Sequence, residues 1–301
     1  MSLRTTRFVL LITAAAIISW LALVAVYGVA SHGDQQSHIL LVLPVSLVLM
    51  YSERGKVFRN AEYCLPAGAV LILFGLMSAW LRGHPLPLGQ DDSLSLQMSL
   101  FIGSCIAAFI LCYGAAAFRV AVFPLLFLFF MVPIPGFLLE RTIALLQRGS
   151  TDAAFLLLKA ANIPVAREGF ALSLPKFDIE VARECSGIRS SLMLVVITLV
   201  LGHLFLRSNW KKCVVALLVV PIAVVKNGFR IFTLAALGTN VDPSLLHGDL
   251  HRYAGVPSFG LALGAVMLIV RWLHKLEKDS PATRKPYANA VHNPEFMKGG
   301  V

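Results

Sequence analysis

Charged side chains are scarce in this sequence. Only 14% of the 301 residues are Asp, Glu, Lys or Arg, whereas 57% are hydrophobic. A soluble domain carries roughly 25% charged residues, so the composition excludes an ordinary soluble protein and indicates a polytopic membrane protein. Acidic residues are rarest, 16 against 26 basic ones. Because Lys and Arg of membrane proteins collect in cytoplasmic loops, we read the excess as a topology signal and expect no nucleic-acid partner.

The sequence also lacks paired cysteines. An odd number without paired spacing argues against a disulfide framework or a zinc site. Four of the five lie in or beside apolar runs, where we expect them to act as packing residues. His247, Asp249 and His251 share one polar loop, but too few further ligands are visible to fill a metal shell. We therefore expect no metal and no organic cofactor. The five cysteines are Cys64, Cys105, Cys112, Cys185 and Cys213.

Long apolar runs dominate the remainder, and most approach the roughly 20 residues that a bilayer core requires. The first could pass for a signal peptide, but it is too long for a typical apolar region of one. We predict an all-α polytopic membrane protein with about eight transmembrane helices. The expected spans are 8–33, 38–51, 63–81, 96–117, 121–132, 188–206, 213–237 and 256–270.

The segment between the fifth and sixth runs follows other patterns. Pro133 and Pro135 break the fifth helix. Residues 137–161 mix charges with leucines, which favours an amphipathic helix lying at the membrane interface. Residues 162–181 alternate apolar and polar side chains with period two, interrupted by a Pro-Lys pair, which predicts a small extracytoplasmic hairpin.

Basic loops fix the expected topology. With eight spans, the segments around Arg4, Arg54, Arg119, Lys211 and Arg271 fall on one side, which the positive-inside rule makes cytoplasmic. The intervening loops, including 140–185 and 242–252, then face outward. We expect residues 1–275 to form a single transmembrane domain and 276–301 to be a disordered cytoplasmic basic tail.

Cys185 stands at the junction of this outer segment and the sixth run. It lies in Arg183-Glu184-Cys185-Ser186-Gly187-Ile188-Arg189, between two arginines and at a predicted helix start. Positive neighbours and a helix N-terminus both favour thiolate, the nucleophilic form. A free cysteine without a role at a helix start is the alternative, and the sequence around Cys185 alone does not decide between them.

Two further residues are expected at the same membrane face. Arg230 lies in the outer part of the seventh run, where an arginine is costly and marks a functional hypothesis; it could instead be a structural tie. His251 precedes the eighth run, although an ordinary loop histidine is the simpler reading of it alone. Together with Cys185 they would supply nucleophile, base and charge stabiliser. Glu184 and Asn227 could orient or cap the site, and Ser186 could be a helix N-cap.

The pieces resemble the exosortase/archaeosortase family of membrane-embedded cysteine transpeptidases. The resemblance covers residues 133–259 and rests on three motifs in order: the Glu184 to Ser190 segment, Asn227-Gly228-Phe229-Arg230-Ile231, and His251 followed by Gly255 and Phe259. It implies Cys185 as nucleophile, Arg230 as the essential arginine and His251 as the third member, with Arg189 in a supporting place. The C-terminal accessory domain fused to some members is absent, which leaves the subtype open.

The resemblance implies a protein-sorting enzyme in the cytoplasmic membrane of a prokaryote, with its site on the outer face. Its substrates would be exported proteins that end in a short motif, a transmembrane helix and a basic tail. Cleavage through a cysteine thioacyl intermediate would pass them to an acceptor, possibly linked to lipid or polysaccharide. Two rivals remain: a transporter or polysaccharide-export component, and a non-catalytic membrane partner of secreted proteins. The first should place several ionisable residues at mid-membrane on different helices.

Overall fold

A computed structural model describes residues 3–32, 36–59, 62–84, 87–240 and 255–278. These form two compact units, Met1–Leu145 and Leu146–Val301, and each is described by itself. Five helices are long and apolar enough to cross a membrane, or seven if each of two bent helix pairs is one span. The chain is therefore a predominantly helical, multi-pass membrane protein. The count of eight spans and the side of each loop stay predictions.

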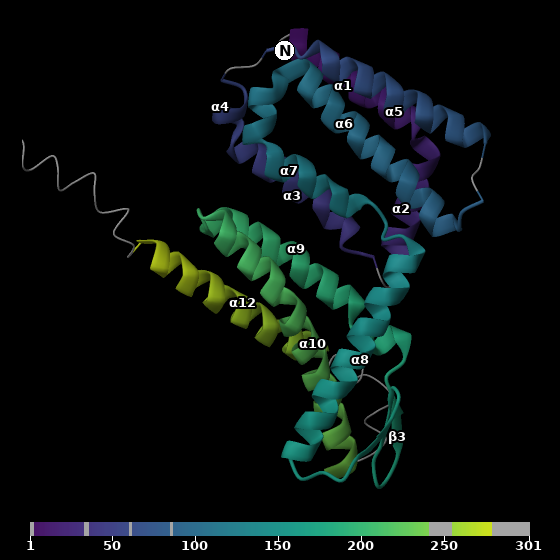
Figure 1. The fold of residues 1–301 in the computed structure, drawn as a ribbon, viewed down its shortest axis with the longest axis vertical. Coiled ribbons are helices and arrows are strands. Elements are labelled where there is room, and N and C mark those ends of the chain that lie inside the picture. Colours follow the sequence, from purple (N-terminus) through teal and green to yellow (C-terminus); the bar gives the residue numbers. More distant parts are fainter. Residues whose placement is uncertain (1–2, 33–35, 60–61, 85–86, 241–254, 279–301) are drawn as a thin grey trace, which may run out of the picture. The chain divides into compact units, whose positions relative to one another are not determined.

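The first unit packs around its longest helix, α6, which lies beside α1 and α5 (Figure 1). Apolar side chains along α6, among them Met98, Ile102 and Phe109, are almost fully buried. Phe8 of α1 meets Phe109 and Tyr113 edge-on, which adds aromatic contacts to this core. The elements are α1 (Leu3–Ile18), α2 (Trp20–His32), α3 (Ile39–Ser52), α4 (Arg54–Val57), α5 (Leu65–Gly83), α6 (Gln90–Val120), α7 (Val122–Phe127) and the 3-10 helix η1 (Leu128–Met131).

A helix break follows η1 where the two prolines predict it. Proline disrupts a helix because it lacks the N–H donor and clashes with the preceding turn. The backbone groups freed here are taken up by side chains of the same unit. Gly136 donates its N–H to Asp92 at 2.7 Å, Ile134 donates to Gln36 at 3.0 Å, and Ser95 donates to the carbonyl of Pro133 at 2.7 Å. The break is thus a hydrogen-bonded turn, and helix α8 (Gly136–Ala160) begins directly after it.

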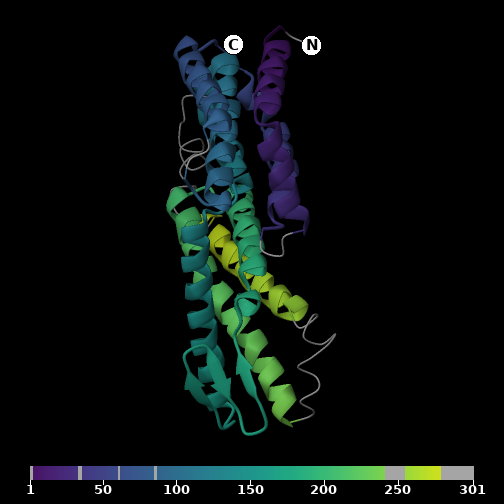
Figure 2. The same cartoon turned by 90° about the vertical axis from the view of Figure 1, so that its right-hand side faces the viewer.

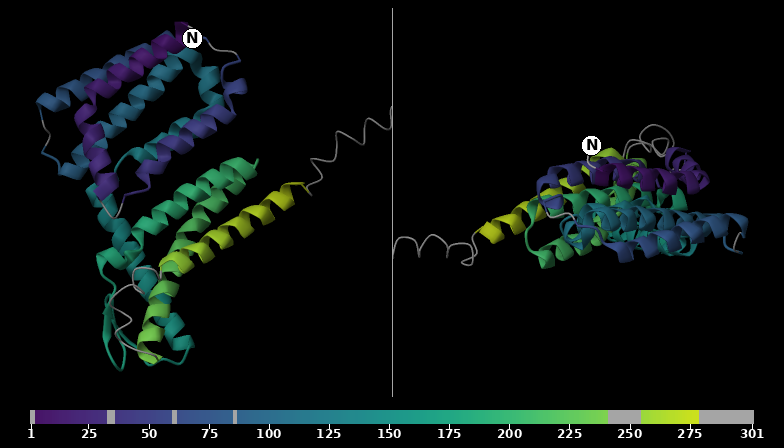
Figure 3. Two further views of the ribbon diagram at one scale, coloured as in Figure 1. Left: turned by 180° about the vertical axis from the view of Figure 1, so that it is seen from behind. Right: turned by 90° about the horizontal axis from the view of Figure 1, so that it is seen from above.

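Three helices of the second unit pack side by side, as the view from behind shows (Figure 3). They are α9 (Ile188–Phe205), α10 (Asn209–Asn240) and α12 (Gly255–Lys278). Their shared core contains Leu194, Val219 and Val266. Helix α10 runs unbroken through its polar segment at Lys226–Arg230. The polar residues therefore sit on a continuous helix, and their spacing of three and four residues decides which of them share a face.

A three-stranded antiparallel sheet precedes α9, where the sequence predicts a hairpin. Its strands are β1 (Ala166–Glu168), β2 (Ala171–Ser173) and β3 (Asp178–Glu180), in the order β1-β2-β3. The alternation reflects burial of Leu172 and Leu174 against Ala154, Leu158 and Ala235. The sheet lies beside the later halves of α8 and α10 (Figures 1 and 2). The predicted hairpin corresponds to β2 and β3. Strand β1 was not predicted, because three residues are too few to show an alternating pattern.

Two bends explain why the spans are harder to count than the apolar runs. The first run forms α1 and α2, which meet at 75°, and the fifth run forms α7 and η1, which meet α8 at 89°. Helix α3 is apolar but only 14 residues long. Helix α8 matches the predicted amphipathic segment and has buried residues at Leu146, Ser150 and Leu158. Its placement at the membrane interface stays a prediction.

Candidate functional site

Cys185 lies in a short turn between the sheet and helix α9. The turn is a 3-10 helix over Arg183–Ser186 (η2), held by the bond from the Cys185 N–H to the carbonyl of Ala182 at 3.0 Å. Gly187 follows with φ of +74° and caps α9. The prediction of Ser186 as the N-cap was wrong, because the left-handed residue at 187 takes that position. Ser186 is fully buried, and its hydroxyl accepts a long hydrogen bond, 3.4 Å, from the N–H of Ile188.

Asn227 of α10 holds this turn from the side. Its Nδ2 lies 3.0 Å from the carbonyl oxygen of Cys185, 3.1 Å from that of Ser186 and 3.0 Å from the hydroxyl of Ser150 on α8. Asn227 is 1% exposed. Buried amide donors bonded to backbone carbonyls fix the position of the chain they bind. One side chain thus ties the cysteine turn, α8 and α10 together, and an orienting role for Asn227 in catalysis stays a prediction.

Glycines allow the three segments to approach so closely. A β-carbon on Gly228 would lie 2.5 Å from Cβ of Ala153, and one on Gly149 would lie 2.9 Å from a methyl group of Val224. Both contacts join α8 to α10. Small residues at such crossings let helix backbones come together in membranes. In the motif Asn227-Gly228-Phe229-Arg230, Gly228 is therefore required for the close packing of α10 against α8.

Arg230 lies three residues beyond Asn227 on α10. That spacing places it on the same helix face, about one turn further along. Its side chain is partly buried, and its Nε is buried without a hydrogen-bond partner among the described residues. A guanidinium N–H held in this way can donate to an anion, such as a thiolate or a developing oxyanion. A purely structural arginine would be expected to hydrogen-bond a carboxylate or a carbonyl. Among the described residues, Nε of Arg230 has no such partner.

Lys226 is a second buried cation beside the turn, and the sequence reasoning did not select it. It is 6% exposed, and its Nζ donates to the hydroxyl of Ser190 on α9. Ser190 donates in turn to the carbonyl of Gly187 at 3.1 Å. The signal was available, since an ionisable residue in an apolar span marks a functional candidate. Lys226 links α10 to the first turn of α9, directly after the cysteine turn.

The other predicted residues are placed as follows. His251 lies outside the described residues, as do His247 and Asp249. Glu184 belongs to η2, and its side chain is not described. Arg189 is exposed in the first turn of α9. The structure thus brings Asn227 into contact with Cys185 and Ser186. Arg230 lies one turn further along the same helix, and the His251 contribution stays a prediction.

A largely apolar cavity of about 410 Å³ lies beside Lys226, and neither Cys185 nor Arg230 is among the residues that line it. Lys226 and Phe229 of α10 line it, and they flank Asn227 in the sequence. Leu157 of α8, and Ser258 and Leu261 of α12, form further parts of its wall. Within the described residues, no group of three or more His, Cys, Asp or Glu side chains could hold a metal ion. Of the two cations near the cysteine turn, Lys226 alone lines this apolar cavity.

Comparison with known proteins identifies one family. The model of the transmembrane exosortase family matches residues 29–268, which is most of the chain and includes every described segment of the second unit except the last turns of α12. No curated protein and no solved structure is significantly similar to the chain. On the extent of the family match, the chain belongs to the transmembrane exosortases.

Proposed function

We propose that this protein is a cysteine-dependent sorting enzyme that cleaves the C-terminal signal of exported proteins. The observation that carries the proposal is the contact between two motifs 42 residues apart: Asn227 donates to the carbonyl of Cys185. The thiol-bearing turn is therefore held by the same helix that carries Arg230. Fixing a nucleophile within a rigid frame lowers the entropy cost of attack. Family membership supports the class of reaction.

In the proposed cycle, the Cys185 thiolate attacks the scissile carbonyl carbon and forms a tetrahedral oxyanion. Collapse of that intermediate breaks the C–N bond, leaves a thioacyl enzyme, and releases the downstream segment as an amine. His251 is the proposed donor of the proton that this amine takes up. An acceptor amine, or water, then attacks the thioester and gives its proton to His251, and the C–S bond breaks to regenerate the thiolate. Every step uses a residue of the chain or the two substrates.

Arg230 is the proposed charge stabiliser. Its Nε is buried and unpartnered among the described residues, so this donor need not leave another acceptor before it meets an oxyanion. Preorganised donors of this kind contribute roughly 10²–10³-fold to rate when they face developing charge. Arg189, Glu184 and Ser186 take supporting places in the proposal, and the structure offers Ser186 as a buried part of the turn.

The proposed substrates end in a short motif, a transmembrane helix and a basic tail. The cavity beside Phe229 has an apolar wall on α8, α10 and α12, which suits the membrane-spanning part of such a signal. We place the site on the outer face of the cytoplasmic membrane, because the basic loops then all fall on the cytoplasmic side. The acceptor, possibly linked to lipid or polysaccharide, would enter from that face.

The test is processing of a co-expressed exported protein that carries such a signal. Cys185→Ser should abolish the mobility shift on a gel while the protein stays in the membrane, because a hydroxyl is hardly ionised near neutral pH. Cys213→Ser is the matched control, since Cys213 is an exposed free cysteine on α10. It should process normally. A thioacyl adduct on Cys185, sought by mass spectrometry, would identify the intermediate.

A non-catalytic membrane component of protein or polysaccharide export is the second candidate. It is favoured by the amount of purely structural bonding at the site, above all the bonds of Asn227. Such a protein needs no thiol, so full processing by Cys185→Ser would remove the enzyme proposal and leave this one. His251→Ala separates the roles further: the enzyme proposal expects lost processing with slow alkylation of Cys185 retained.

A further inference from the structure

The far end of the second unit contains a second cavity, of about 580 Å³, between α9 and α12. Its apolar wall includes Leu201 and Phe205 near the end of α9, and Met267 of α12. Phe205 is the last residue of α9, whereas the cysteine turn precedes the first. Eighteen residues at about 1.5 Å each separate the two ends by roughly 27 Å. The cavity therefore lies about one hydrocarbon thickness from Cys185 and takes no part in the site there.

One face of α12 supplies a basic rim to this cavity. The rim consists of Arg271, His274, Lys275 and Lys278, which recur at helical spacing in its last two turns. Arg271 and Lys275 are exposed, and Nδ1 of His274 is buried without a hydrogen-bond partner among the described residues. Among the residues that line the cavity, none is acidic. Positive charge thus gathers where the apolar run of α12 ends.

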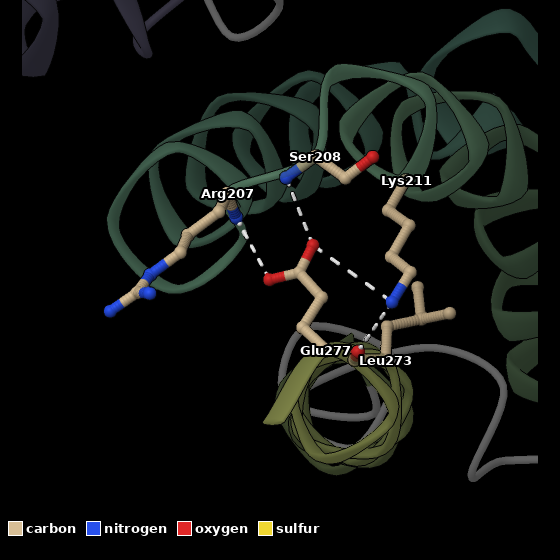
Figure 4. A network of polar contacts seen from close by, with 5 residues as sticks. All are labelled: Arg207, Ser208, Lys211, Leu273 and Glu277. Carbon is tan, nitrogen blue, oxygen red and sulfur yellow. Dashed lines mark hydrogen bonds and ion pairs between the residues drawn. The ribbon is translucent and has the colours of Figure 1, made fainter. Parts of the chain in front are cut away.

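The carboxylate of Glu277, between these basic residues in sequence, is turned to another partner. It accepts the backbone N–H of Arg207 and of Ser208, both at 2.9 Å, at the connection between α9 and α10 (Figure 4). Lys211 approaches it at 3.9 Å and donates to the carbonyl of Leu273 at 3.1 Å. This network fixes the end of α12 against α9 and α10, and so fixes which face carries the basic rim.

We propose that this cavity binds an anionic phospholipid. Arg271 and Lys275 would contact the headgroup phosphate, and an acyl chain would lie along Leu201, Phe205 and Met267. The adjoining surface of α12 is apolar and exposed at Leu268, as expected for a helix that faces lipid tails. A free anion would gain nothing from that wall. Basic pockets between transmembrane helices near the membrane surface recognise such headgroups. The proposal goes beyond the proposed sorting activity and does not depend on it.

The test measures lipid binding to the purified protein by native mass spectrometry, with phosphatidylglycerol or phosphatidylcholine added. We expect wild type to bind phosphatidylglycerol more tightly. The double variant Arg271→Gln, Lys275→Gln should bind it roughly thirtyfold more weakly, from the typical contribution of a basic residue near anionic lipid. The matched control is Arg54→Gln, Lys56→Gln, which removes two exposed charges from the first unit and should bind like wild type.

Three results would overturn the proposal: equal affinity for the two lipids, an equal loss in the control variant, or displacement of phosphatidylglycerol by inorganic phosphate at comparable concentration. The last would mean that the site takes a free anion. If the double variant does not fold, wild type alone decides. Its preference for phosphatidylglycerol must then fall as salt is raised, because screening weakens contacts between exposed charges. Since lipid binding is read directly, the result does not depend on substrate processing.

Discussion

The backbone of Gly187 faces the carboxamide of Asn227 so closely that a β-carbon at position 187 would lie 2.7 Å from Oδ1 of Asn227. The same glycine has φ of +74°. The cysteine turn therefore depends on the absence of a side chain at Gly187 and on the buried amide of Asn227, 40 residues later in the chain.

Gly187→Ala should destabilise the second unit and impair processing. The left-handed backbone costs about 1–2 kcal/mol for a residue with a β-carbon, and the overpacking against Asn227 adds about 1–3 kcal/mol. Thermal unfolding of the purified protein measures the first effect and substrate cleavage the second. Gly202→Ala is the control on the same helix, because a β-carbon there meets nothing within 4 Å. Equal unfolding temperatures for the two variants would contradict the prediction.

Asn227→Ala should leave the carbonyls of Cys185 and Ser186 without their donor. Each buried acceptor left unpaired costs about 1–3 kcal/mol, and loss of the tether should also reduce processing. Thr233→Ala is the matched control on α10, because Thr233 is bonded only to its own helix, at the carbonyl of Phe229, in the contacts described. Alkylation of Cys185, measured over time, reports the freed turn independently of activity. An unchanged alkylation rate would argue against the tether.

Arg230→Lys should lower processing sharply while the protein accumulates normally. Lysine keeps the charge but lacks the planar fork of donors, and it offers no group in place of the buried Nε. The measurements are cleavage of the co-expressed substrate and the amount of protein in the membrane. Arg119→Lys, at an exposed arginine at the end of α6, should change neither. Disappearance of the Arg230 variant from the membrane would favour a structural tie instead.

The effects of Lys226 and Ser190 substitutions on the free energy of unfolding should not be additive: the second substitution should offset part of the loss caused by the first. Ser190→Ala removes the acceptor of a buried ammonium group and should destabilise the protein. Adding Lys226→Met removes the stranded charge, so the double variant should recover part of the loss. Thr198→Ala with Lys226→Met is the control pair, because Thr198 bonds the carbonyl of Leu194 within α9. Strict additivity of the Lys226 and Ser190 changes would rule out the contact.

Reporter fusions should place Asp91 and Lys211 on opposite sides of the membrane, with Asp91 outside. The expectation follows from eight spans and the positions of the basic loops. The short apolar helix α3 and the two bent helix pairs are the elements on which the count depends. Reporters on the same side would remove the span count, and the outer placement of Cys185 with it.

Much of the helical pattern could be predicted, because apolar runs and proline breaks are local signals. The break at Pro133 and Pro135 appears as expected, whereas the 75° bend between α1 and α2 occurs at Ser19 without any Pro or Gly beside it. Nothing in the local sequence marks that bend. Strand β1 (Ala166–Glu168) was missed for a similar reason, since three residues are too few to establish an alternation.

The sequence indicates candidate residues for the site, but it does not indicate the contacts between them. Cys185, Asn227 and Arg230 stand out by charge and position in the sequence. The bond from Asn227 to Ser150 joins residues 77 apart, and no periodicity reports such a distance. Lys226 was visible as a charge in a span, but its partner Ser190 lies on another helix. The role of His251 stays a prediction.

Helix α9 is long and apolar enough to cross a membrane. Its first residue follows the cysteine turn, and its last lies at the basic cavity. If α9 crosses the bilayer, its length sets the distance between the thiol and the opposite headgroup layer. A thicker bilayer would draw that thiol toward the hydrocarbon, and a thinner one would lift it into water. The sorting reaction should therefore respond to acyl-chain length in the host membrane, even where no residue at the site contacts a lipid.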